Sequence, residues 1–229
     1  KYKMSVMDVI KLRPSVAIAD PELLLSLPPA LTASTGVDAL THAIEAYTCK
    51  VSQPITDALA LHAIELISSS IVEAGENGSN LEARTNMLNG SLMAGAAFIN
   101  SNVGAVHAIS ETIGAWYDTP HGVGNSIFLP YIMEYNVPAN PEKFARIATI
   151  LGVDPAGKTD EEVAMEGVEK VKELNARVKI PKLKDLDYIK EEYFKEIADC
   201  SASNPLSDDN AREIDAEGYL QVIYEAYKA

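Results

Sequence analysis

The sequence is poor in cysteine, in histidine and in basic residues. Its two cysteines, Cys49 and Cys200, lie far apart and form no CxxC motif, so we expect neither a disulfide framework nor a zinc knuckle. A reducing cytoplasm is the expected location. The chain has 19 lysines and arginines and 33 acidic residues, which gives a net charge of −14. Because phosphate binding requires clustered Lys and Arg, this balance argues against nucleic acid and anionic membranes as partners.

Motifs that define two further classes of protein are absent from the 229 residues. There is no GxGxxG, no P-loop and no alternation of strand and helix, so no nucleotide-binding α/β domain is visible. No apolar run approaches the length of a membrane span, and the opening residues KYKMSVMDV lack the pattern of a signal peptide. The chain is long enough for a sizeable core in one or two domains.

Helix signals dominate the chain after its first 30 residues. Before them, prolines block a continuous helix, and we expect only two short strands, at 4–10 and 15–19. NGSN at 77–80 marks a turn, and Thr159 with Glu162 forms a capping box. Helices are expected at about 31–49, 54–74, 80–99 and 103–116, from near Gly122, at 141–152, after Thr159, and at 187–199 and 215–227.

The expected fold class is therefore all-α, a multi-helix bundle with short irregular or β segments at the N-terminus. We find no internal repeat and no Gly- or Ser-rich linker. Residues 152–160 are a candidate boundary between two helical halves, but nothing in the sequence requires two domains.

Two polar residues interrupt the apolar run GVDALTHAIEAY at 36–47. Asp38 and His42 are four residues apart, so on a helix their side chains share one face. The pair is compatible with a structural hydrogen bond, with a capping device or with half of a metal site, since bundles place metal ligands at this spacing on inward faces.

A second stretch, GAVHAISETIGAWYDTPHGVGN at 104–125, carries two of the four histidines. His107 lies on an expected helix, either as a buried core histidine or as a ligand. His121 lies in TPHG at an expected helix start, where the helix dipole favours the neutral imidazole that a metal needs. The alternative for His121 is a capping role. His62, on the second expected helix, is interpreted as a surface or packing residue.

Together the four candidate ligands from these segments offer one carboxylate and three imidazoles. The set is Asp38, His42, His107 and His121. It suits Fe(II) or Zn(II) better than Mg²⁺ or Ca²⁺, which favour shells of oxygen. One negative ligand would leave a bound divalent ion with net positive charge, able to stabilise an alkoxide or hydroxide.

GVDALTHAIEAY and GAVHAISETIGAWYDTPHGVGNSIFLP resemble the two signature stretches of the iron-containing (group III) alcohol dehydrogenase family. PSVAIADPELLLSLPP, ARTNMLNGSLMAGAAFINSNVGAVH and the tail NPLSDDNAREIDAEGYLQVIYEAY agree with the same family. The resemblance covers essentially the whole chain. It implies that residues 1–229 form the family's C-terminal, helical, metal-binding catalytic domain, of the dehydroquinate synthase-like type.

The resemblance also implies roles for individual residues. The family's four metal ligands fall on Asp38, His42, His107 and His121. The family uses Fe(II), or Zn(II) in some members, to bind the oxygen of a small alcohol or aldehyde, and a hydride passes to or from NAD or NADP. The family's N-terminal dinucleotide-binding domain has no counterpart in these residues, so we expect this chain to be inactive alone and to need that domain as its partner.

The chain departs from the family at two positions. Many members have a histidine one helical turn after His107, often assigned to a proton relay, where this chain has Glu111. Glu111 either relays a proton or faces solvent. The tail reads NPL where NPR is frequent, so Leu206 stands in place of an arginine.

Several residues between the ligands are candidates for the substrate pocket. Phe98 precedes the second signature stretch, and Trp116 lies between His107 and His121. Two functions outside the dehydrogenase family also fit a metal-binding bundle. One is a metallohydrolase with Glu111 as its base, and the other is a structural metal-binding module. The dehydrogenase interpretation itself is compatible with a homo-oligomer.

Overall fold

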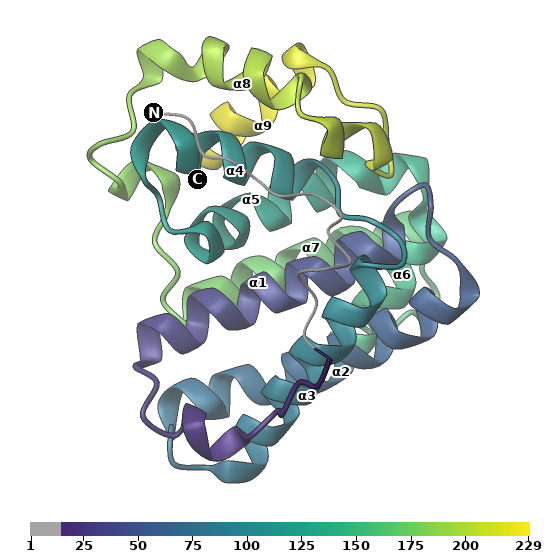
Figure 1. The fold of residues 1–229 in the computed structure, drawn as a ribbon. Helices are drawn as coiled ribbons and strands as arrows, with labels where there is room; N and C mark the ends of the chain where they lie inside the picture. Colours follow the sequence, from purple (N-terminus) through teal and green to yellow (C-terminus); the bar gives the residue numbers. More distant parts are fainter. Residues whose placement is uncertain (1–14) are drawn as a thin grey trace.

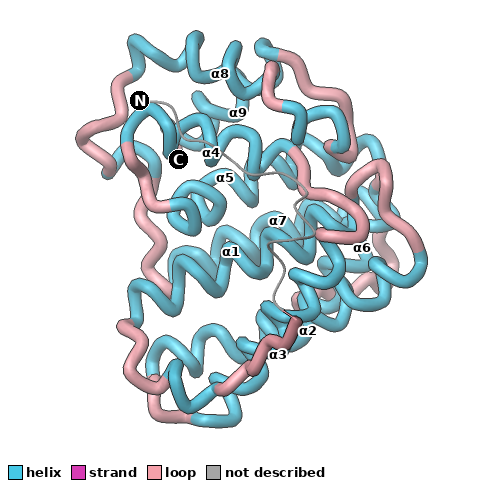
Figure 2. The backbone as a smooth tube through the Cα atoms, in the orientation of Figure 1, coloured by secondary structure: helices cyan, strands magenta, loops and turns pink. Residues whose placement is uncertain are grey.

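The computed structural model describes residues 15–229, and their regular elements are all helical, with no strand among them (Figure 2). The α-helices of these residues are α1 (Pro29–Thr48), α2 (Pro54–Glu76), α3 (Leu81–Phe98), α4 (Ala105–Tyr117), α5 (His121–Asn136), α6 (Pro141–Ile150), α7 (Asp160–Arg177), α8 (Phe194–Ala202) and α9 (Ala216–Lys228). Five 3-10 turns join them, η2 (Pro21–Leu24), η3 (Val137–Ala139), η4 (Leu183–Asp185), η5 (Glu191–Tyr193) and η6 (Pro205–Asp209). The expected all-α class is confirmed.

Helix α1 crosses the middle of the molecule and is its central element (Figure 1). It packs against α2 and α3 on one side and against α5 on another. Helix α4 lies beside α5, and α8 and α9 cover this pair at the top of the view. The ends of α4 and α5 are thereby brought against the face of α1 that carries Asp38 and His42.

Most of helix α1 is buried, and the core around it is apolar. Val37, Leu40 and Ala43 are fully buried, and the α2 residues Ile64 and Ile67 pack in the same cluster. Burying such side chains contributes about 1.5–3 kcal/mol each. The polar residues of α1 therefore sit within a rigid apolar frame.

The expectation that no apolar segment approaches the length of a membrane span needs correction for α2. Its 23 residues are long and apolar enough to cross a membrane by length and composition alone. The same test is passed by core helices of soluble proteins, and α2 packs against both α1 and α3, with Ala60 and Ile71 among its buried residues.

Two sequence predictions of secondary structure are wrong. Residues 15–19 form no strand, and they lead instead into the 3-10 turn η2, with Val16 and Ile18 exposed and no partner strand among the described residues. The strand predicted at 4–10 lies outside the described residues. The helix predicted at 187–199 begins at Phe194, because the buried helical spacing of Phe194, Ile197 and Ser201 starts only there.

Candidate metal centre

Helix α1 presents three polar residues on one face, one helical turn apart. Asp38 and His42 are separated by four residues, and Glu45 follows three residues later. All three lie in a helix whose other positions are mostly buried and apolar. Residues at such spacings are neighbours on a helix surface, so α1 holds these side chains without any contribution from loops.

The other two histidines come from the beginnings of α4 and α5. His107 is the third residue of α4, and His121 is the first residue of α5. The Ser110 hydroxyl donates to the backbone oxygen of His121 at 3.1 Å, which ties α5 to α4. Gly122 lets α5 approach α1 closely, since a Cβ there would lie 2.6 Å from the backbone oxygen of Ser34.

The structure brings the four predicted ligands together. One ligand atom from each of Asp38, His42, His107 and His121 lies within 4.8 Å of the others. Oδ1 of Asp38 is 3.6 Å from Nε2 of His121 and 3.9 Å from Nε2 of His107. Metal–ligand bonds of about 2.1 Å allow two ligands of one ion to be at most about 4.2 Å apart. Donor types and spacing therefore fit a divalent ion such as Fe(II) or Zn(II), with only a small contraction of the set.

Asn125, four residues after His121 on α5, contacts three of these ligands. Its Nδ2 lies 2.6 Å from Oδ1 of Asp38, 3.1 Å from Nε2 of His107 and 3.0 Å from Nε2 of His121. An amide nitrogen carries two N–H donors and no acceptor, so its hydrogen bonds here occupy lone pairs that a metal ion would need. The ligand atoms thus converge on one small volume, from which a bound ion would displace the amide.

Glu45 connects α1 to the first turn of α4. Oε1 accepts a hydrogen bond from the backbone N–H of Val106 at 2.8 Å, and Oε2 lies 2.5 Å from Nδ1 of His107. Glu45 and His107 are each 4% exposed. Neither Glu45 nor Asn125 was predicted from the sequence. Their spacing could have indicated them, because Glu45 shares a helix face with Asp38 and His42, and Asn125 shares one with His121.

The electrostatic environment differs between His42, which is half-buried, and His107, which is buried. Burial, with the nearby His107, lowers the pKa of His42 to about 4, so its imidazole is neutral at physiological pH. Burial also disfavours the charged form of His107, but the carboxylates of Glu45 and Asp38 outweigh burial and hold the pKa of His107 above its ordinary value. A metal ion would therefore compete with a proton for His107.

The remaining predicted residues lie at different places around this cluster. The ring of Phe98 stacks on His42, with centroids 4.6 Å apart. Asn204 donates to Oε2 of Glu111 at 3.1 Å. Trp116, at the end of α4, is 43% exposed and its ring lies 5.6 Å from that of Tyr193.

Two further residues singled out in the sequence were not predicted as ligands. His62 is outside the cluster and lies 3.2 Å from the carboxylate of Glu65 on the surface of α2, as a surface histidine should. Leu206 is buried in the apolar core.

Comparison with known proteins identifies the family. The model of the Fe-containing alcohol dehydrogenase family, C-terminal, matches residues 32–227. This chain belongs to that family. It is 42% identical to 1,3-propanediol dehydrogenase of Klebsiella pneumoniae, over 93% of the chain and 55% of that protein. It is 39% identical to NAD-dependent methanol dehydrogenase of Bacillus methanolicus, over 90% of the chain and 55% of that protein.

Solved structures of the Fe-containing alcohol dehydrogenase family agree with the fold. An alcohol dehydrogenase from Oenococcus oeni superimposes with a TM-score of 0.88 at 41% identity, covering 91% of this chain and 54% of that one. The chain thus spans about half the length of the relatives it matches. The resemblance that the two signature stretches carried is confirmed, and the ligand cluster lies on those stretches.

Proposed function

We propose that this chain is the helical metal-binding catalytic part of an NAD(P)-dependent alcohol dehydrogenase. The observation that carries the proposal is the convergence of ligand atoms from Asp38, His42, His107 and His121 within 4.8 Å. The donor set suits Fe(II) or Zn(II). When bound, the ion would act as a Lewis acid on the oxygen of a small alcohol or aldehyde, and NAD(P) would exchange the hydride.

Residues beside the ligands would position the substrate and move its proton. Phe98, stacked on His42, would limit the size of the group next to the metal centre. Glu111 would exchange a proton through Oε1, since Asn204 already donates to Oε2 and orients the carboxylate. Trp116 would contribute to a more distant wall of the pocket.

The proposal extends to the protein of which these residues would be part. An N-terminal nucleotide-binding domain would hold NAD(P) against the metal centre, while 1–229 would act as one helical domain in a cytoplasmic enzyme. A homo-oligomer is compatible with this arrangement. This chain alone would then not turn over alcohols.

Elemental analysis of the purified chain, after removal of loosely bound ions, tests the proposal. About one Fe or Zn per chain is expected from a set of four ligands. The absence of stoichiometric metal after reconstitution with both ions would contradict it. Absorption spectra of a cobalt-substituted sample should also change on addition of a small alcohol, because a catalytic site keeps an open position and a structural site does not.

A further inference from the structure

Glu45 is an unusual residue at its position, because a carboxylate is buried in the apolar frame of α1. The residue is 4% exposed, and burying an ionised carboxylate is costly unless its oxygens are paired. Both oxygens of Glu45 have partners, and both partners lie in the first turn of α4. The geometry therefore links the helix that carries Asp38 and His42 to the helix that carries His107.

The first of these partners is a free helix end. The N-terminal N–H groups of an α-helix have no partner within the helix. Gly104, the N-cap of α4, makes no side-chain capping bond. Instead, Val106 donates to Glu45 at 2.8 Å and Ala105 donates to Asn210 at 3.2 Å. A negative charge here is also favoured by the helix dipole.

The second partner is a metal ligand. A carboxylate only accepts, so the short contact between Oε2 of Glu45 and Nδ1 of His107 requires the proton on Nδ1. In the neutral imidazole Nε2 is then left with a lone pair, and Nε2 is the atom that faces Asp38 and Asn125. Histidine ligands commonly donate their other N–H to such a carboxylate, which sets the tautomer and makes the imidazole a better ligand.

We propose that Glu45 is a positioning residue of the metal centre, which caps α4 with one oxygen and sets the tautomer and orientation of His107 with the other. The inference rests on the proposed function, since it assigns Glu45 a role toward the metal ion. It adds a requirement that the four ligands alone do not contain. A side chain with only one acceptor oxygen cannot serve both donors of α4.

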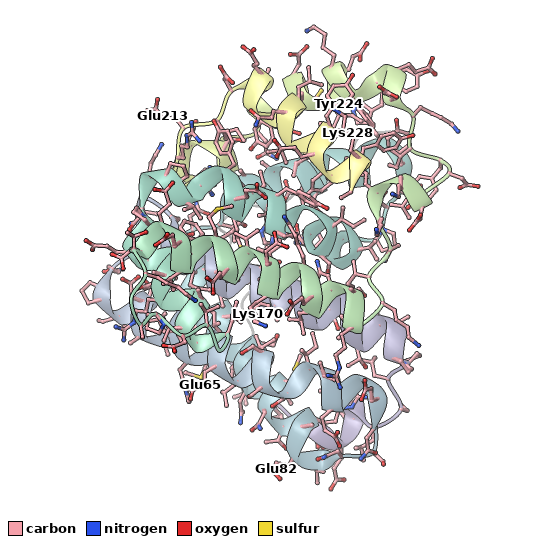
Figure 3. The ribbon with its side chains drawn as sticks, turned by 180° about the vertical axis from the view of Figure 1, so that it is seen from behind. Glu65, Glu82, Lys170, Glu213, Tyr224 and Lys228 are labelled. Carbon is pink, nitrogen blue, oxygen red and sulfur yellow. The ribbon has the colours of Figure 1, made fainter. Side chains whose placement is uncertain are left out.

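Glu45→Gln tests this requirement in the chain at almost unchanged volume. Zn(II) and Co(II) affinities of the variant should fall by about 10–100-fold, as is typical for the hydrogen-bond partners of metal ligands, while circular dichroism keeps its helical signal. The matched control is Glu65→Gln. Glu65 also faces a histidine Nδ1, that of His62 at 3.2 Å, but it lies on the outer surface (Figure 3). The Glu65→Gln substitution should leave metal affinity unchanged.

A second measurement needs no variant of Glu45. In ¹⁵N-histidine NMR spectra recorded at increasing pH until the imidazoles have lost their charge, neutral His107 should carry its proton on Nδ1. Each of the four histidines can be assigned by single substitution. A proton on Nε2 of His107, or equal metal affinities of wild type and Glu45→Gln, would overturn the proposal. Absence of metal from the wild type would instead contradict the proposed function, and the NMR result would still decide the role of Glu45.

Discussion

At the scale of single residues, the four candidate ligands differ in how firmly the fold holds them. His107 is buried and bonded to Glu45, whereas the side chain of His121 is 47% exposed at the first residue of α5. His121→Ala should therefore remove one ligand with little loss of packing. We expect metal affinity to fall by more than the roughly 100-fold upper range for outer partners of ligands, with the helices retained.

Elemental analysis and circular dichroism check this expectation side by side. His62→Ala is the control, because His62 lies on the surface outside the cluster. If His121→Ala retained one metal ion per chain with unchanged affinity, the site described here would not be the metal site.

A second single-residue prediction concerns Gly122 and the close approach of α5 to α1. A Cβ at this position would lie 2.6 Å from the oxygen and 3.0 Å from the carbonyl carbon of Ser34, both in the α1 backbone. Gly122→Ala should push α5, with His121, away from Asp38. We expect about 1–3 kcal/mol of lost stability, as for other overpacked sites, together with weaker metal binding.

Gly95→Ala is the matched control for Gly122→Ala. Gly95 lies inside α3, and a Cβ there would meet nothing within 4 Å. The substitution should stabilise the chain by about 0.5–1 kcal/mol through helix propensity. Urea unfolding of both variants measures the contrast, and equal effects would show that close approach at Gly122 is unimportant.

At the scale of elements, helix starts were predictable where a local signal specifies them. Pro54 and Pro141 begin α2 and α6, and the capping box of Thr159 and Glu162 precedes α7 as expected. The start of α8 at Phe194 was not predictable, because the preceding segment folds into 3-10 turns without a strong local stop signal.

The candidate site was likewise predictable from the sequence only in part. Its four predicted ligands stand out as rare histidines and an aspartate in apolar stretches, on one helix face or at a helix start. Glu45 and Asn125 did not, because a lone Glu or Asn has many surface roles. Only the tertiary packing of α1 against α4 and α5 gives them their partners.

The capping box of α7 makes an element-scale prediction about pH. Hydrogen bonds from the Thr159 backbone N–H and hydroxyl hold the pKa of Glu162 below its usual value. A lowered folded pKa means that the stabilisation is present above the unfolded pKa near 4.5 and is lost as pH falls through the folded pKa. Glu162→Gln should therefore lose less stability between pH 7 and pH 3 than the wild type does, measured by urea unfolding. Parallel pH profiles would contradict the role of this box.

At the scale of the whole molecule, the candidate metal centre brings together residues of α1, α4 and α5. A ligand that binds only the folded state stabilises it by about 2.7 kcal/mol at one hundred times its Kd. For a domain of this size, that corresponds to a rise in Tm of about 5–10 °C. Zn(II) should raise Tm by this amount in calorimetry, and a chelator should reverse the rise without loss of helix. His121→Ala should show almost no Zn(II)-dependent rise.

Cofactor binding makes the last prediction at this scale. The 229 residues contain no glycine-rich phosphate-binding motif, and their net charge of −14 repels a dinucleotide that is itself an anion. We therefore expect isothermal calorimetry to detect no NAD(H) binding by the zinc-loaded chain. The same preparation should bind Zn(II) stoichiometrically, which shows that it is folded. Micromolar NAD(H) affinity would contradict this prediction. It would show that the helical part itself, rather than the proposed N-terminal domain, binds the cofactor.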